Sequence, residues 1–309
     1  MGDILNLLYA MPGAVAQGLI WGIMAIGVYI TYKLLDLADL TVDGTMCTGG
    51  AVCIMMMVTG HNVFFSMFVA TVAGAIAGLV TGLLHTVLGI PAILAGILTQ
   101  LGLYSINLRI MDNKSNQAIN VNNYDLLISL RYIRDVPFYK NTIFIVGIIL
   151  IVLIAILYWF FGTEVGASIR STGANQTMSR AQGINTSLTK IFGLMISNGI
   201  VAFASALYAQ YQGFADINAG RGAIVIGLAA VIIADVIFGK IHSNFAFKLL
   251  FVAFGGVIYY VVLQIVLFLG LNANDLKLIS ATIVAIFLSV PHIKERYLSN
   301  LFNKKGGNN

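Results

Sequence analysis

The sequence predicts an all-α polytopic membrane protein with about nine transmembrane helices. Of the 309 residues, 59% are hydrophobic and only 9% are charged, and the mean hydropathy of +0.92 lies far outside the range of soluble domains. Residues 141–161 contain no charged side chain, and about 20 apolar residues are enough for a helix to cross a hydrocarbon core. The apolar runs are continuous and do not alternate with polar residues, which favours helices over a β-barrel.

Hydropathy and glycine spacing describe how these helices are arranged. The runs near 43–59 and 222–238 are short and each follows an irregular polar stretch, so we predict that both helices are broken or re-entrant. Glycines recur every four residues at Gly74, Gly78 and Gly82, which predicts close helix packing. The predicted spans, all in one transmembrane domain of residues 1–309, cover residues 14–34, 43–59, 63–89, 91–110, 140–162, 187–212, 222–238, 245–270 and 277–292.

The distribution of basic residues predicts the orientation. The tail, residues 293–309, carries four lysine or arginine residues and is expected on the cytoplasmic side of a bacterial plasma membrane. Counting spans back from the tail makes residues 162–190 cytoplasmic and residues 111–139 an extracellular loop. No basic residue precedes the first apolar run, so we expect no removable signal peptide.

Two short segments resemble each other. "ADLTVDG", residues 38–44, and "ADINAGR", residues 215–221, share Ala-Asp, an aliphatic residue and then Thr or Asn, and both lead into a Gly- and Ala-rich apolar run. The predicted topology places them near opposite faces of the membrane, as an inverted repeat would. Chance similarity between two polar junctions explains the match equally well.

The sequence contains no constellation typical of an enzyme. The four histidines lack a metal-binding spacing, and Gly239-Lys240 is not part of a GxxxxGK[ST] phosphate loop. No GxSxG elbow is present. We therefore expect no catalytic residue, no metal site and no nucleic-acid partner.

A few polar residues lie inside the spans, where ionisable groups are costly and often functional. Asp43 and Asp235 either serve a pathway or flank helix ends in contact with water, and Asp43 is also placed to N-cap the second helix. The uncharged polar residues inside the spans either line a pathway or form hydrogen bonds with neighbouring helices. The candidate pathway residues are Asp43, Thr45, Thr48, Asn198 and Gln264.

The polar stretch of residues 162–190 separates two strongly apolar spans. Asn175 suits a helix N-cap and Gly183 suits the position after a helix end, so we predict a short helix between them. We expect residues 163–170, "TEVGASIR", to form a turn that leads to it. A helix of this size is marginal in water, which favours a partner protein that holds it.

The residues of this stretch resemble a known family. "GASIRSTGANQTMSRAQGIN", residues 166–185, is similar to the cytoplasmic coupling segment of membrane subunits of bacterial ABC importers of the branched-chain amino acid, ribose and nucleoside type. Residues 206–239 and 34–52 are similar to two further regions of that family. Ser171, Thr177 and Met178 stand where Ala is common, and Asp235 stands where a Gly is typical. The match is carried by Gly166, Arg170, Gly173, Asn175, Gly183 and Ile184.

This resemblance implies a type II ABC-importer-like fold and the role of a permease subunit. It implies that a separate ATPase subunit binds ATP and Mg, that this chain binds no cofactor, and that an extracellular solute-binding protein delivers the solute. It implies two membrane subunits in the membrane lipid; symmetry favours a homodimer, although some family members pair with a different membrane subunit. Its subgroup points to amino acids, aromatic ones among them. We expect residues 111–139 and 213–221 to receive the binding protein. An ATP-independent secondary carrier or channel is the alternative. The residues expected to couple to the ATPase are Glu164, Arg170, Gly173, Asn175, Arg180 and Gly183.

Overall fold

A computed structural model describes residues 2–121, 124, 126–133, 137, 140–239, 244–269, 278, 280–287 and 289. Within them the chain is a bundle of helices, seven of which are long and apolar enough to cross a membrane. The all-α membrane fold is therefore confirmed, but the count of nine is not, because α9 is a shorter apolar helix and residues 277–292 lie largely outside the described part. The elements are α1 (Gly2–Tyr29), η1 (Ile30–Leu34), α2 (Thr41–Val58), α3 (Val63–Thr86), α4 (Ala92–Ile110), β1 (Asn116–Ala118), η2 (Leu130–Ile133), α5 (Thr142–Gly162), α6 (Glu164–Ala174), α7 (Gln176–Ala181), α8 (Thr186–Gln212), β2 (Phe214–Asp216), α9 (Ala223–Phe238) and α10 (Phe245–Phe268).

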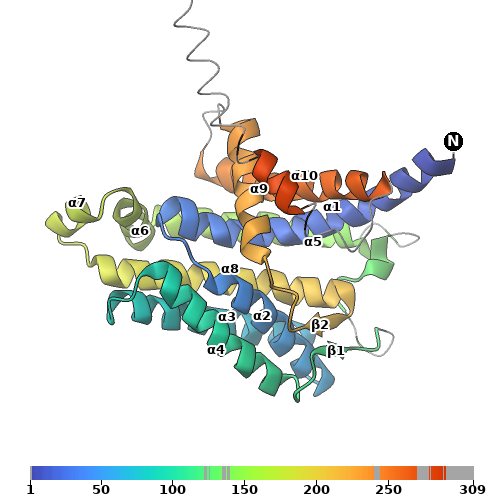
Figure 1. Ribbon diagram of the computed structural model, residues 1–309, viewed down its shortest axis with the longest axis horizontal. Coiled ribbons are helices and arrows are strands. Elements are labelled where there is room, and N and C mark those ends of the chain that lie inside the picture. Colours follow the sequence, from blue (N-terminus) through green and yellow to red (C-terminus); the bar gives the residue numbers. More distant parts are fainter. Residues whose placement is uncertain are drawn as a thin grey trace, which may run out of the picture.

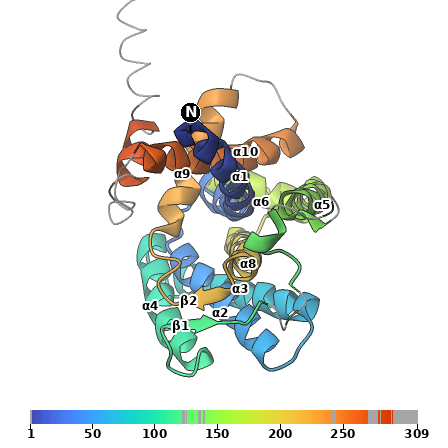
Figure 2. The same cartoon turned by 90° about the vertical axis from the view of Figure 1, so that its right-hand side faces the viewer.

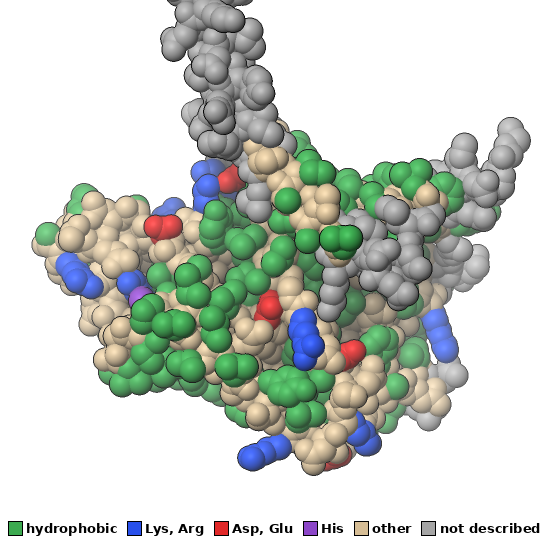
Figure 3. Space-filling model, viewed as in Figure 1, with side chains coloured by type: hydrophobic (Ala, Val, Ile, Leu, Met, Phe, Trp, Pro, Cys, Tyr) green, Lys and Arg blue, Asp and Glu red, His purple; other side chains and the backbone are tan. Residues whose placement is uncertain are grey.

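Helix α8 is the centre of the bundle. Seen end-on, α1, α5, α9 and α10 lie on one side of α8, and α2, α3 and α4 lie on the other (Figure 2). The predicted glycine face of α3 lies against it, since a Cβ on Gly74, Gly78 or Gly82 would clash with or crowd α8. The side chains that α3, α4 and α5 turn outward are mostly large and apolar. Figure 3 shows such a hydrophobic surface over α3 and α4, as expected of helices that face lipid.

The chain is irregular between the first helix and α2, in the polar stretch that precedes the short apolar run near residues 43–59. Its last turn widens into the π-helix η1, and residues 35–40 are not helical before α2 begins at Thr41. The start of α2 lies beside the middle of α8, because the Thr45 hydroxyl donates a hydrogen bond to Asn198 Oδ1 at 2.7 Å. Irregular backbone at this depth is tolerated where protein surrounds it, and Thr41, Val42 and Thr45 are fully buried.

Helices α2 and α9, which follow the two similar segments, run in opposite directions from a common starting point. A Cβ on Gly220 would clash with the Asp43 carbonyl, so the N-termini of α2 and α9 lie together. From there α9 runs to Asp235, which pairs with Lys33 at the end of η1. Helix α2 runs the other way, towards β2, where Gly50 approaches Ala215 (Figure 1). The prediction that the two segments lie near opposite faces of the membrane is therefore wrong, because they contact each other inside the bundle. Only the opposite directions of α2 and α9 are those that an inverted repeat would give.

The two polar stretches are more ordered than the sequence suggests. The predicted helix after Asn175 is present as α7, but the predicted turn over residues 163–170 is wrong, because those residues belong to α6. Thr163 caps α6 by accepting a hydrogen bond from Gly166 N at 3.4 Å. In the stretch of residues 111–139, β1 pairs with β2 in antiparallel register, Asn116 opposite Asp216.

Candidate coupling segment and translocation pocket

The candidate coupling segment, residues 162–190, which we call the coupling segment, lies at one end of the bundle, where α7 projects beyond the N-terminus of α8 and α6 lies next to it (Figure 1). Glu164 is exposed in the first turn of α6, and Arg170 is exposed on the same helix. Asn175 N-caps α7 as predicted, since its Oδ1 accepts a hydrogen bond from Met178 N at 3.0 Å. Gly183 has a φ of +84° directly after the helix, the left-handed conformation that glycine adopts without strain.

Hydroxyl contacts join this segment to α8. The Thr172 and Thr189 hydroxyls are 2.9 Å apart, and the Arg180 Nε donates a hydrogen bond to Thr186 Oγ1 at 2.8 Å. Gly173 packs so closely on η1 that a Cβ would overlap the Leu34 carbonyl. The two short helices of the segment are therefore tied to the start of α8 and to the end of η1.

The outer surface of α7 is open. Thr177, Met178 and Arg180 are exposed, and the Met178 side chain is 58% exposed. A flexible thioether on an exposed helix suits contact with another protein. The six candidate coupling residues all lie on α6, on α7 or directly beside them.

Asp43 caps a helix, although not the one that the sequence predicted. Leu40 is the N-cap of α2, so the expectation that Asp43 caps this helix is wrong. Its carboxylate accepts hydrogen bonds from Gly222 N at 3.0 Å and Ile224 N at 2.9 Å. Asp43 therefore neutralises the N-terminus of α9, where unpaired N–H groups carry partial positive charge.

The sequence reasoning missed Asp39, which is buried at the break before α2. Its Oδ1 accepts a hydrogen bond from Thr41 N at 2.9 Å, and its Oδ2 accepts one from Asn198 Nδ2 at 2.7 Å. The Asn198 Oδ1 in turn accepts from Thr45. An Asp just before a helix start, whose side chain often accepts a hydrogen bond from the backbone two residues on, was the available signal. Thr45 and Asn198 therefore belong to a network that holds the break.

The remaining candidate pathway residues do not share one site. The Thr48 hydroxyl donates to Gly44 O at 3.0 Å within its own helix. Thr48, Thr45 and Asn198 do not line the cavity at Asp43 or the cavity at Gln264. Gln264 lines a cavity of about 550 Å³ between α1, α8, α9 and α10, beside Trp21 and Tyr208, and Arg221 borders this cavity as well. Asp43 lines a different cavity. The structure therefore brings Thr45 and Asn198 together and leaves Gln264 apart from both.

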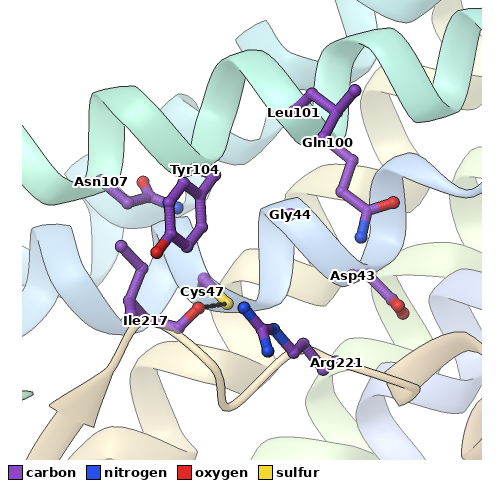
Figure 4. Close-up of a pocket in the computed structure, with 9 residues that line it drawn as sticks. All are labelled: Asp43, Gly44, Cys47, Gln100, Leu101, Tyr104, Asn107, Ile217 and Arg221. Carbon is purple, nitrogen blue, oxygen red and sulfur yellow. Dashed lines mark hydrogen bonds between the residues drawn. The ribbon is translucent and has the colours of Figure 1, made fainter. Parts of the chain in front are cut away.

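The cavity at Asp43, here called the α2–α4 pocket, has a volume of about 390 Å³. Asp43, Gly44 and Cys47 of α2 form one wall, and Gln100, Leu101, Tyr104 and Asn107 of α4 form the opposite one. Ile217 and Arg221, in the segment between β2 and α9, close the third side. Figure 4 shows Gln100, Tyr104 and Asn107 projecting from α4 towards α2, with the Arg221 guanidinium beside Cys47.

Comparison with known proteins identifies the family. A family model described as "Branched-chain amino acid transport system / permease component" matches residues 11–289. The chain belongs to this permease family.

Several curated relatives support the assignment over nearly the whole permease. This chain is 36% identical over 277 residues to a tyrosine transport system permease protein of Clostridioides difficile, and the match covers 90% of both chains. It is 35% identical over 289 residues to an uncharacterized protein of Rickettsia prowazekii, covering 92% of this chain and 98% of the relative. A fructose import permease protein of Bifidobacterium longum is 25% identical over 272 residues, covering 86% and 73% of the two chains. No solved structure matches significantly.

Asp235 of the permease has a local partner. Its carboxylate pairs with Lys33 Nζ at 2.8 Å, and the two side chains are 47% and 51% exposed. A solvent-exposed pair of this kind contributes little to stability. Asp235 thus joins the end of α9 to the end of η1 and is far from the α2–α4 pocket along α9.

Proposed function

We propose that this permease is a membrane subunit of an ATP-driven, binding-protein-dependent importer in a bacterial plasma membrane. The observation that carries the proposal is the coupling segment, two short helices at one end of the bundle with an open outer surface. A helix as short as α7 is marginal by itself, and a groove in an ATPase subunit would hold it from outside. ATP and Mg would bind to that subunit and not to this chain.

We further propose an amino acid as the solute, of the aromatic kind. Support comes from the relative named as a tyrosine transport system permease protein, at 36% identity over 90% of the chain. The more distant relative named as a fructose import permease protein is only 25% identical. The branched-chain amino acid description of the family agrees with an amino acid.

The orientation and partners follow from the coupling segment. If α6 and α7 are cytoplasmic, β1 and β2 at the opposite end of α8 are extracellular, and residues 111–139 and 213–221 meet there through antiparallel pairing. Their proximity supports the proposal that both receive a solute-binding protein. A second copy of the chain would complete the transport path, since a two-fold interface needs only one surface.

Purification from the native membrane tests the proposal. The tagged permease is solubilised in a mild detergent, and the proteins that remain bound are identified by mass spectrometry. We expect an ATPase subunit in equal amount, and ATP-dependent uptake of labelled tyrosine after reconstitution with the binding protein. A permease that emerges alone from several mild detergents, and that transports without ATP, would instead be a secondary carrier.

A further inference from the structure

The α2–α4 pocket lies at the depth of the membrane interior. A Cβ on Gly44 would touch the backbone of Gln100, the ninth residue of the nineteen in α4. Asp43 and Arg221 line this pocket, so two ionisable side chains lie beside the middle of the spanning helix α4. Ionisable groups at this depth are expensive, and they typically mark the path of a polar solute.

Several polar groups in the pocket have no partner of their own. Asn107 is fully buried, and neither its Oδ1 nor its Nδ2 has a hydrogen-bond partner in the described part of the chain. Within the same residues, Arg221 takes part in no ion pair. A buried amide without a partner costs free energy, and its retention suits a ligand that supplies the missing bonds.

Asp43 and Cys47 contribute differently. The Asp43 carboxylate already accepts two backbone hydrogen bonds, but an ionised carboxylate has about four acceptor positions. The Cys47 thiol donates to the Ile217 carbonyl at 3.0 Å and so holds the segment that carries Arg221. The pocket thus presents a carboxylate with free capacity, a guanidinium and an amide to one space.

We propose that the α2–α4 pocket is a transit site for a zwitterionic α-amino acid, an inference that rests on the proposed function. Arg221 binds the carboxylate of the solute, because a guanidinium matches a carboxylate with two parallel hydrogen bonds. Asp43 binds its ammonium group. Asn107 bonds the polar end of the side chain, and Tyr104 packs against an aromatic ring. A volume of about 390 Å³ falls within the range of small-molecule sites.

Photolabelling tests this site without depending on the specificity of the binding protein. The permease–ATPase complex in lipid nanodiscs is irradiated with 4-azido-L-phenylalanine, and the labelled peptides are identified by mass spectrometry. We expect label within residues 100–107, which line only the α2–α4 pocket, displaced by excess tyrosine. Tyramine, which lacks the carboxylate, displaces it poorly.

Two variants remove the binding groups, and a third serves as a control. Arg221→Met and Asn107→Leu are expected to reduce the labelling and tyrosine uptake about tenfold or more, since each removes a buried or charge-assisted hydrogen bond. The Asn107→Leu protein should have the same melting temperature as the wild type or a higher one. If the Asn107 amide had a purely structural role, this variant would have a lower melting temperature. Arg109→Met removes an exposed positive charge from the same helix, outside the pocket, and should label and transport normally.

The outcomes separate the two proposals. Tyrosine uptake by the wild-type complex with unchanged labelling and uptake in Arg221→Met and Asn107→Leu would overturn the transit site and leave the proposed function standing. Label confined to the cavity beside Trp21 and Gln264 would also overturn it. If the wild-type complex transports no amino acid, the proposed function fails, and the transit site fails with it.

Discussion

Replacing Asp43 with Asn should weaken the junction between α2 and α9. The Asp43 oxygens accept hydrogen bonds from Gly222 N and Ile224 N, and an Asn side chain keeps only one acceptor oxygen. The N–H group that loses its partner costs about 1–3 kcal/mol, and loss of the negative charge at a helix N-terminus costs roughly another 0.3–1 kcal/mol. The sum is about 1–4 kcal/mol. Asp43→Ala, which removes both acceptors, should cost more.

The measurement is the apparent melting temperature of the purified permease, followed by tryptophan fluorescence. We expect a fall of several degrees for Asp43→Asn and a larger fall for Asp43→Ala. Asp216→Asn is the matched control, because Asp216 accepts one backbone hydrogen bond, from Asn218 N, in an exposed turn. Melting temperatures for both Asp43 variants equal to that of Asp216→Asn would refute the capping role.

Three further predictions concern the coupling segment and the ion pair. Gly173→Ala should clash with the backbone of η1 and abolish uptake, whereas Gly162→Ala, which meets open space, should transport normally in the same vesicle assay. Gly183→Pro should abolish uptake while the protein stays in the membrane, because proline cannot adopt a φ of +84°. Gly60→Pro is the matched control, because it imposes the same strain at another left-handed glycine, at φ +91°. We expect this variant to lose stability but to retain uptake. Uptake by Gly183→Pro equal to that of Gly60→Pro would contradict the coupling role. Asp235→Asn should change the free energy of unfolding by less than about 1 kcal/mol, and a clear loss of transport would show that this pair does more than join two helix ends.

Much of the fold can be read from the sequence because the membrane simplifies the signal. A helix that faces lipid must be continuously apolar, so hydropathy finds its presence and its approximate bounds. The predicted span 140–162 nearly coincides with the outward-facing α5, Thr142–Gly162. The breaks before α2 and α9 were also predictable, since a polar stretch precedes each short apolar run.

Glycine explains the main error in the fold. The predicted turn over residues 163–170 contains Gly166, but Gly166 and Gly173 both lie within α6, where another backbone comes too close for a Cβ. Gly183 does mark a turn, with its positive φ. The same residue type serves close packing and left-handed backbone, and only the position of the neighbouring segment distinguishes the two.

The candidate pocket was less accessible to sequence reasoning because its partners are distant in the chain. Asp43 stood out as a charge inside a span. Its hydrogen-bond donor Gly222, however, lies 179 residues further along the chain. Asn107 and Arg221 carry no motif. Their significance comes from a shared cavity and, among the described residues, from an Asn107 amide without a hydrogen-bond partner and an Arg221 without an ion pair. Neither feature can be inferred from local pattern.

Helix α8 offers a physical connection between the two candidate sites. At its beginning, Thr186 and Thr189 bond the coupling segment. Halfway along, Ser197 donates to the Gly27 carbonyl at 2.7 Å, and Asn198 bonds Asp39 at the break before α2. Asp43 follows four residues later on the wall of the α2–α4 pocket. A displacement of α7 would therefore reach the pocket through one continuous helix and a fully bonded polar network, and packed helices transmit such shifts because they cannot deform continuously. For this reason we expect ATP-driven movement at the coupling segment to change access to the α2–α4 pocket.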